Sequence, residues 1–242
     1  MLIFCRVSGC ILMMPAIGER YVPVRIRLIA ALTITLATYP VIIDFLPSNY
    51  DITPLALAVL IFKETVIGLF FGLIARLFIS ASHIAGMVIA YQSGLASAIM
   101  FDPATGSQGS SIGAFLTLTS SVLFFVGDLH HLLLMGLIDS YSLVIFDDYL
   151  IIEDMTDYII NIISEIFVIG IQISAPYIVV GTLVYIGAGI SSRLMPNMQI
   201  FFVLMPAQIL LGFFILAATF SIVMLWYINH IADKLEDFVI FH

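Results

Sequence analysis

The residues that could carry chemistry are few, and the densest group of them is Asp128-Leu129-His130-His131. Imidazole and carboxylate groups are zinc ligands, and both can act as general bases. Neighbouring histidines on a helix, however, are expected to diverge by about 100°, and no second cluster of Glu or His completes a coordination set. The H-E-x-x-H and P-loop patterns are absent from the sequence. We therefore predict no catalytic residue, metal ion or cofactor, and we interpret this group as a loop or the polar start of a helix.

The charged residues within or beside apolar stretches include Lys63, Glu64, Arg76 and Arg193. A charge at the centre of a bilayer costs about 2.5–3.5 kcal/mol on insertion scales, so such side chains usually face protein or water. They could form a proton or ion relay, they could form interhelical salt bridges, or they could mark a helix end that lies outside the hydrocarbon. Adjacent Lys63 and Glu64 do not share a helix face, so each needs a partner elsewhere. We interpret the four charges as buried and structural.

A third feature is the corner Met100-Phe101-Asp102-Pro103, which leads into a polar run rich in Gly and Ser that ends at Ser111. Bulky apolar side chains on flexible backbone can close a pore by excluding water, and methionine adapts its shape to what it touches. An ordinary interhelical loop is the alternative, and the physics of these residues alone favours it.

The amino-acid composition indicates whether water or lipid surrounds the elements that position these residues. Of 242 residues, 62% are hydrophobic and 10% are charged, whereas an ordinary soluble domain carries about 25% charged residues. A soluble fold of this size cannot cover so much apolar surface. The net charge of −8 and the scarcity of Lys and Arg argue against a nucleic-acid partner. The sequence therefore predicts one membrane-embedded domain over residues 1–242, without a separate soluble domain.

Acidic residues crowd one short stretch between apolar segments: Asp147, Asp148, Glu153, Asp154 and Asp157. We interpret this stretch as a solvated loop. A docking face for a partner is the alternative.

The apolar segments predict helices, because open sheet edges would leave backbone groups unsatisfied in lipid. A spanning helix needs about 20 predominantly apolar residues. The stretches that reach or approach this length are Leu28–Ile43, Pro54–Arg76, Leu77–Met100, Ile112–Val126, Leu129–Phe146, Tyr158–Ser191 and Met198–Ile228. Residues 2–17 form a further apolar segment that is short for a span.

Local signals place several helix boundaries. Pro54 suits the first turn of a helix, and Ser110 or Ser111 can cap the helix that starts at Ile112. Pro176, Pro196 and Pro206 predict kinks or breaks. The predicted fold is all-α, a multi-helix membrane-associated protein of packed helical hairpins with broken helices.

Four sequence blocks then form a pattern. They are Met14–Arg20 with Val22–Arg27; Tyr91–Pro103 continued by Gly106–Ser110; Asp128–Tyr141; and Ala175-Pro176 with Ser192–Pro196, Phe201-Phe202 and Met205-Pro206. In this order they resemble the FliR family of flagellar protein-export gate subunits, which is related to the SctT proteins of virulence type III secretion. The resemblance covers residues from about 6 to about 225.

The resemblance implies a subunit of the bacterial inner membrane and the flagellar basal body that uses no cofactor. It would join FliP-like and FliQ-like subunits in a hetero-oligomeric gate through which unfolded protein substrates pass. The family's central loop, which corresponds to about residues 99–111, plugs the pore. The matching residues are Ile99, Met100, Phe101, Asp102, Pro103, Gly106 and Gly109. Some members place two large aromatics before the Asp-Pro, whereas this chain has Met100 and Phe101.

The predicted function is therefore a core subunit of the flagellar type III export gate, required for flagellum assembly and without enzymatic activity. An SctT-like virulence subunit is the nearest alternative. A secondary transporter with Lys63, Glu64 or Arg76 in its pathway is another, although the inverted repeats typical of that class are not evident. An intramembrane hydrolase built on Asp128 and His130 is the most distant.

Overall fold

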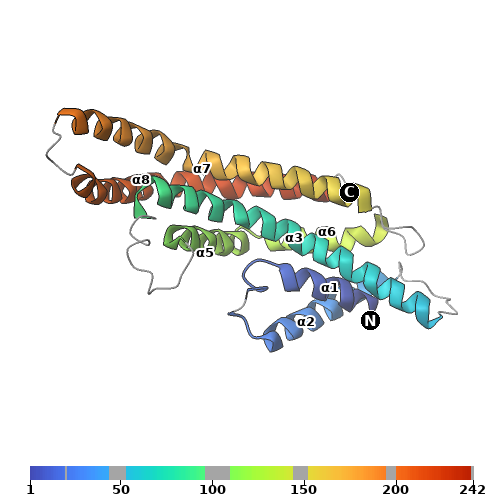
Figure 1. Ribbon diagram of the computed structural model, residues 1–242. Helices are drawn as coiled ribbons and strands as arrows, with labels where there is room; N and C mark the ends of the chain where they lie inside the picture. The colour runs from blue at the N-terminus through green and yellow to red at the C-terminus, as the bar shows by residue number, and fades with distance from the viewer. Residues whose placement is uncertain (20, 44–52, 96–109, 144–151, 195–199, 241–242) are drawn as a thin grey trace. The chain divides into compact units, whose positions relative to one another are not determined.

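The computed structural model describes residues 1–19, 21–43, 53–95, 110–143, 152–194 and 200–240. Regular structure within these residues is entirely helical (Figure 1). The helices are α1 (Leu2–Met13), α2 (Val24–Ile42), α3 (Pro54–Gln92), α5 (Ser111–Val126), α6 (Leu129–Leu143), α7 (Ile152–Leu194) and α8 (Ile200–Ile240). The all-α prediction is confirmed.

Four of these helices contain stretches long and apolar enough to cross a membrane: Val24–Ile42, Pro54–Gln92, Met155–Leu194 and Leu204–Phe238. A fifth candidate is the pair α5 and α6, which is bent by 66° at a short break. Asp128, in this break, has a left-handed φ of 57°, and the bend confirms the prediction of a broken helix. These lengths agree with a membrane-embedded protein.

Some predicted boundaries hold and others do not. Helix α3 begins at Pro54 as predicted, but it continues through Arg76 for 39 residues, so the boundary between Arg76 and Leu77 is wrong. A single arginine does not interrupt the helical hydrogen bonds, because its long side chain can extend away from the helix. Helices α7 and α8 likewise continue through Pro176 and Pro206. Each proline removes one hydrogen bond, but neither helix is interrupted there, so the predicted break is absent and a kink stays a prediction.

The described chain divides into two compact units, and the first comprises residues 1–79, 121–164 and 230–242. In this unit α1 contacts α3 through glycines. A Cβ at Gly9 would lie 2.9 Å from the carbonyl oxygen of Thr65, and a Cβ at Gly72 would lie 2.5 Å from that of Cys10. Such small residues allow helix backbones to approach closely where lipid offers no hydrophobic drive.

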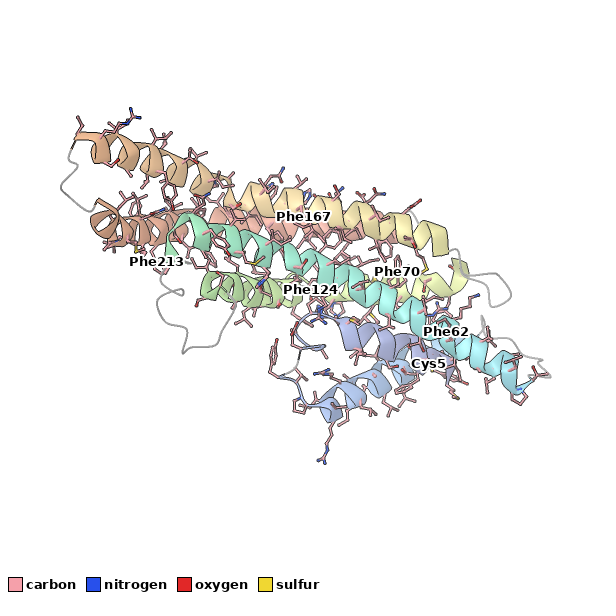
Figure 2. The ribbon with its side chains drawn as sticks, viewed as in Figure 1. Cys5, Phe62, Phe70, Phe124, Phe167 and Phe213 are labelled. Carbon is pink, nitrogen blue, oxygen red and sulfur yellow. The ribbon has the colours of Figure 1, made fainter. Side chains whose placement is uncertain are left out.

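Aromatic rings fill another part of the first unit. Phe238 near the end of α8 lies 5.1 Å from Phe71 of α3 and 5.0 Å from Tyr158 of α7, measured between ring centroids. Phe70, labelled in Figure 2, joins the same cluster at 6.2 Å from Phe238. These distances are typical of favourable aromatic pairs, so parts of three long helices are held together here.

The second unit comprises residues 80–120 and 165–229, and therefore most of α5, the last parts of α3 and α7 and the first three quarters of α8. Helices α3 and α5 cross where Gly86 meets Gly113, since a Cβ at Gly86 would lie 2.6 Å from the nitrogen of Gly113. Large apolar side chains on α7 and α8 are exposed in this unit, among them Phe167 and Phe213 (Figure 2). Lipid or other subunits must cover them.

Candidate functional site

The described interior of the first unit contains a buried ion pair between α1 and α3. Arg6 is 0% exposed and Glu64 is 1% exposed. The Nε of Arg6 donates to Oε2 of Glu64 at 2.7 Å, and Nη2 donates to Oε1 at 2.8 Å. This bidentate arrangement is the strong form of an arginine–carboxylate pair.

Helix α6 completes the network. Nη1 of Arg6 donates to Oγ of Ser140 at 2.8 Å, and the hydroxyl of Tyr141 donates to Oε2 of Glu64 at 3.1 Å. The guanidinium carbon of Arg6 also lies 3.6 Å from the centroid of the Tyr141 ring, a cation–π contact. Both buried charges are therefore neutralised and hydrogen-bonded, which joins α1, α3 and α6.

Sequence analysis singled out Glu64 but missed Arg6. The available signal was that Arg6 is the one charged residue within the apolar stretch of residues 2–17, and a lone charge there needs an opposite charge in another helix. Ser140 and Tyr141 carried no signal of their own, since their relation to Glu64 depends on how the helices pack. Lys63 is also buried, at 6% exposure.

The interpretation of Arg76 and Arg193 as buried is wrong for this chain. The Arg76 side chain is 46% exposed, and its Nη2 lies 3.7 Å from Oε1 of Glu19, which is 38% exposed. The Arg76 side chain extends from α3 to the turn after α1 rather than into the packed interior. Arg193 is exposed in the last turn of α7, where a cation favourably meets the unpaired carbonyl groups of the helix end.

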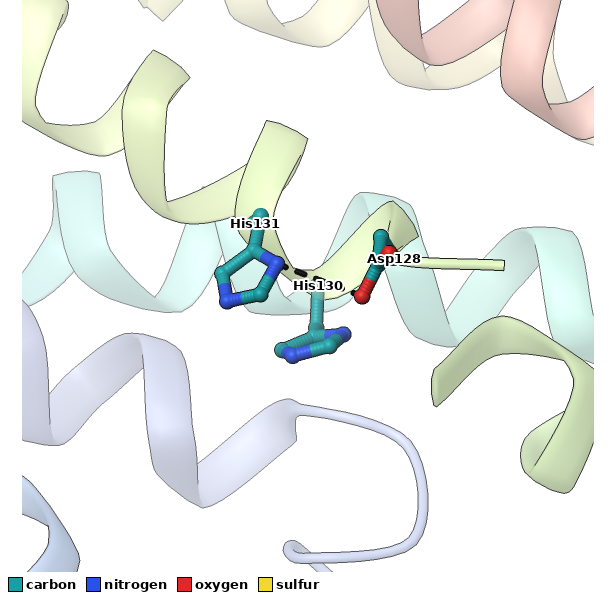
Figure 3. Close-up of side chains that lie close together, drawn as sticks. All are labelled: Asp128, His130 and His131. Atoms are coloured by element: carbon teal, nitrogen blue, oxygen red, sulfur yellow. Dashed lines mark ion pairs between the residues drawn. The ribbon is translucent and has the colours of Figure 1, made fainter. Parts of the chain in front are cut away.

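Asp128, His130 and His131 lie together at the start of α6 (Figure 3). Nδ1 of His131 is 3.4 Å from Oδ1 of Asp128, and the two imidazole centroids are 4.1 Å apart. The predicted divergence of the two histidines is therefore wrong. Their Cβ directions differ as expected on a helix, but the side-chain torsions turn the rings toward each other, with His130 also 4.9 Å from the Phe125 ring.

This cluster is a weak candidate for metal binding. One possible ligand atom from each residue lies within 4.8 Å of the others, whereas ligands at about 2.0–2.1 Å around one tetrahedral zinc ion lie about 3.3 Å apart. The side chains of Asp128 and His131 are also well exposed. The absence of a resident metal stays a prediction.

The predicted plug residues, from Ile99 to Gly109, lie outside the described residues, as do Asp147, Asp148 and Pro196. The other acidic residues, Glu153, Asp154 and Asp157, lie in the first turns of α7, so the loop predicted for them is wrong. The flank that follows the plug is described. Oγ of Ser110 accepts a hydrogen bond from the backbone nitrogen of Gly113 at 3.0 Å, and α5 begins at Ser111. Ser110 is therefore the residue that caps this helix.

Several apolar spans, a helical fold and one neutralised ion pair in a buried interior define a helical membrane protein. Comparison with known proteins narrows this class. The chain belongs to the family described as "Bacterial export proteins, family 1", which it matches over residues 1–234.

Named relatives include flagellar biosynthetic proteins and a Yop translocation protein. The chain is 31% identical to the "Flagellar biosynthetic protein FliR" of Caulobacter vibrioides, over 93% of this chain and 90% of the relative. It is 33% identical to the protein of the same name from Bacillus subtilis, over 92% and 86%. It is also 27% identical to the "Yop proteins translocation protein T" of Yersinia pestis, over 86% and 80%. The resemblance stated from the sequence blocks is confirmed.

Proposed function

We propose that this chain is a core subunit of a flagellar type III protein-export gate, forming part of the pore for unfolded flagellar substrates. The observation that carries the proposal is the match to flagellar relatives over nearly the full length of both chains. The virulence relative is less similar than these two flagellar relatives, and a virulence role is the alternative. The family is one of export proteins rather than a class of enzymes, and we propose no catalytic step.

Residues 99–111 are proposed as the plug of this pore. The support is the resemblance of the block that runs from Tyr91 to Ser110, together with its composition. Met100 and Phe101 supply apolar bulk, Asp102-Pro103 restricts the backbone next to them, and Gly106 and Gly109 supply conformational freedom. Such a segment can exclude water when the pore is closed and yield when a polypeptide arrives.

The proposed role of the Arg6–Glu64 pair is structural rather than a step in proton transfer. Arginine stays protonated at any physiological pH, and both carboxylate oxygens of Glu64 accept hydrogen bonds from it. A proton relay would require Glu64 to gain and lose a proton while its partner remains charged. The geometry favours a permanent pair that fixes α1 against α3 and α6.

A gene deletion tests the flagellar assignment. Cells that lack this chain should have no flagella and no motility, and the intact gene supplied in trans should restore both. Electron microscopy and swimming assays measure the outcome. Normal flagella together with loss of secretion into host cells would instead support the virulence alternative.

Partner subunits are the subject of a second prediction. Helices α2 and α8 expose many large apolar side chains, including Leu36, Leu210, Phe214 and Ile222, and more of this surface is exposed than an isolated soluble protein would tolerate. We propose that FliP-like and FliQ-like subunits, with lipid, cover it. After detergent extraction at native expression levels, mass measurement should show a hetero-oligomer. A stable, monodisperse monomer without associated subunits would contradict the proposal.

A further inference from the structure

The end of α3 in the second unit is capped by another helix. Gln92 is the last residue of α3, and the carbonyl groups of a final helical turn have no partner within their own helix. Gln208 of α8 is buried, and its Nε2 donates to the backbone oxygen of Gln92 at 2.6 Å. A side chain 116 positions away in the sequence thus satisfies this carbonyl group.

Two glycines bring α7 and α8 against the same turn. A Cβ at Gly212 would lie 2.6 Å from the Cβ of Ser93, and a Cβ at Gly181 would overlap Oε1 of Gln92. Gly187 and Gly189 of α7 differ, because a Cβ at either would meet no atom within 4 Å. Among these four glycines, close approach is therefore a specific property of Gly181 and Gly212.

The chain leaves α3 in a defined conformation. Ser93 and Gly94 are buried, and Gly94 has a φ of +73°, a left-handed conformation that glycine adopts without steric cost at helix ends. The backbone nitrogen of Ser93 donates to the oxygen of Ile89 at 2.8 Å, and that of Gly94 donates to the oxygen of Tyr91 at 3.3 Å.

A small cavity lies at this junction, lined in part by Gln92, Ser93, Gln208 and Tyr177. Its volume of about 10 Å³ leaves room for about one water molecule. The junction is therefore too closely packed to bind a ligand, and its polar groups serve the contact between helices.

The chain that follows the plug segment is held on the same helix. Oγ of Ser110 donates to the backbone oxygen of Gly86 at 3.2 Å, next to the close contact between Gly86 and Gly113. Gly86 and Gln92 both belong to α3, and less than two helical turns separate them, since one turn takes about 3.6 residues. The chain before the plug segment thus leaves α3 at Gln92, and the chain after it is hydrogen-bonded through Ser110 to Gly86, in the same short stretch of α3.

We infer that Gln208 is a positioning residue which, with Gly181 and Gly212, fixes the end of α3 and so the point from which the chain enters the plug segment. This inference rests on the proposed role of residues 99–111 as a plug. A seal must return to the same place after each passage, and that requires fixed attachment points. Gln208 supplies one of them by a hydrogen bond between helices.

The first test replaces Gln208 with Leu, which keeps the size of the side chain and removes the donor. In the purified complex, the amides of Ser93 and Gly94 should exchange with deuterium about five- to tenfold faster, because a buried carbonyl loses its partner. Cells with this variant should admit a small solute faster than the parent while the gate still assembles. The matched control is Gln172→Leu, the same change at an exposed position of α7 in this unit, which should alter neither measurement.

The second test uses steric complementation. Gly212→Ala should weaken protection of the same two amides and increase leakage, because its Cβ meets that of Ser93. Adding Ser93→Gly removes the opposing atom and should restore both measurements. Gly189→Ala is the matched control, since its Cβ enters open space.

The outcomes separate this inference from the plug itself. Unchanged amide exchange in Gln208→Leu would overturn the inference, and so would failure of Ser93→Gly to rescue Gly212→Ala. A third outcome is faster amide exchange in Gln208→Leu without a leak. If replacement of Met100 and Phe101 by Gly does produce a leak, this outcome also overturns the inference, and the plug proposal stands without Gln208 as an anchor. If the Gly replacements stay tight as well, the plug proposal fails and the positioning role fails with it.

Discussion

Replacing Arg6 with Gln should abolish assembly of the export gate, whereas Arg76→Gln should leave assembly nearly unchanged. Removing one partner of a buried ion pair typically costs about 3–5 kcal/mol, because the other charge stays buried without a counter-charge. An exposed pair such as Arg76 with Glu19 contributes about 0–1 kcal/mol. Co-purification of tagged subunits from membranes measures assembly, and the two variants make the same chemical change at a buried and an exposed site.

The carboxylate side of the pair should behave in the same way. Glu64→Gln should reduce assembly strongly and Glu19→Gln only slightly, since Glu64 is buried and Glu19 is partly exposed. Tyr141→Phe removes one hydrogen bond to Glu64 and should have an intermediate effect of about 1 kcal/mol.

A double replacement separates a structural pair from a proton relay. Arg6→Met combined with Glu64→Leu removes both charges, and replacing a buried ion pair by apolar residues of similar size is often nearly neutral. This double variant should therefore recover much of the assembly that each single variant loses, and export should recover with it. Restored assembly without export would show that Glu64 takes part in transport itself.

Replacing Met100 and Phe101 with Gly should produce a gate that assembles but leaks. These changes remove the apolar bulk that excludes water from a closed pore, and they lie outside the described helices that hold the subunit together. Deletion of residues 101–110 should have the same consequence at the pore. Uptake of a small solute by cells that carry the altered gate measures the leak, with assembly quantified in parallel.

The control for the plug variant lies in the same segment. Ser107→Gly with Gln108→Gly also adds two glycines but removes no apolar side chain, so it should remain as tight as the parent. A leak in this control would attribute the effect to backbone flexibility rather than to the apolar seal. If the assembled Met100 and Phe101 variant stays tight, residues 99–111 are only a connection between helices.

Membership of the export family, confirmed over residues 1–234, is consistent with what composition predicted about the surroundings of this chain. The same four blocks that carried the resemblance now contain residues with defined contacts. Ser140 and Tyr141 bind the buried ion pair, and Gln92 receives the hydrogen bond from Gln208. The block that contains Ser140 and Tyr141 thus contributes to packing within the first unit, and the block that contains Gln92 contributes to packing within the second, independently of any role in export.

The sequence by itself determined the class of fold and several helix boundaries. Long apolar stretches predict helices because backbone groups in lipid must be satisfied within the segment, and that is a local requirement. The start of α3 at Pro54 and the cap at Ser110 are local for the same reason, since each depends on hydrogen bonds within a few residues. Proline and arginine were misleading within α3, α7 and α8, because tertiary packing holds long helices intact through a single unfavourable residue.

Only the tertiary structure decided which polar groups meet. Arg6 lies 58 positions from Glu64 and 134 from Ser140, and no periodicity connects them. The exposure of Arg76 and the convergence of His130 with His131 depended in the same way on side-chain torsions and on neighbouring elements. The hydropathy of a segment indicates how much of its surface avoids water, but it does not indicate which helices pack against each other. The pairing of buried charges depends on which helices pack together, and only the tertiary structure determines that.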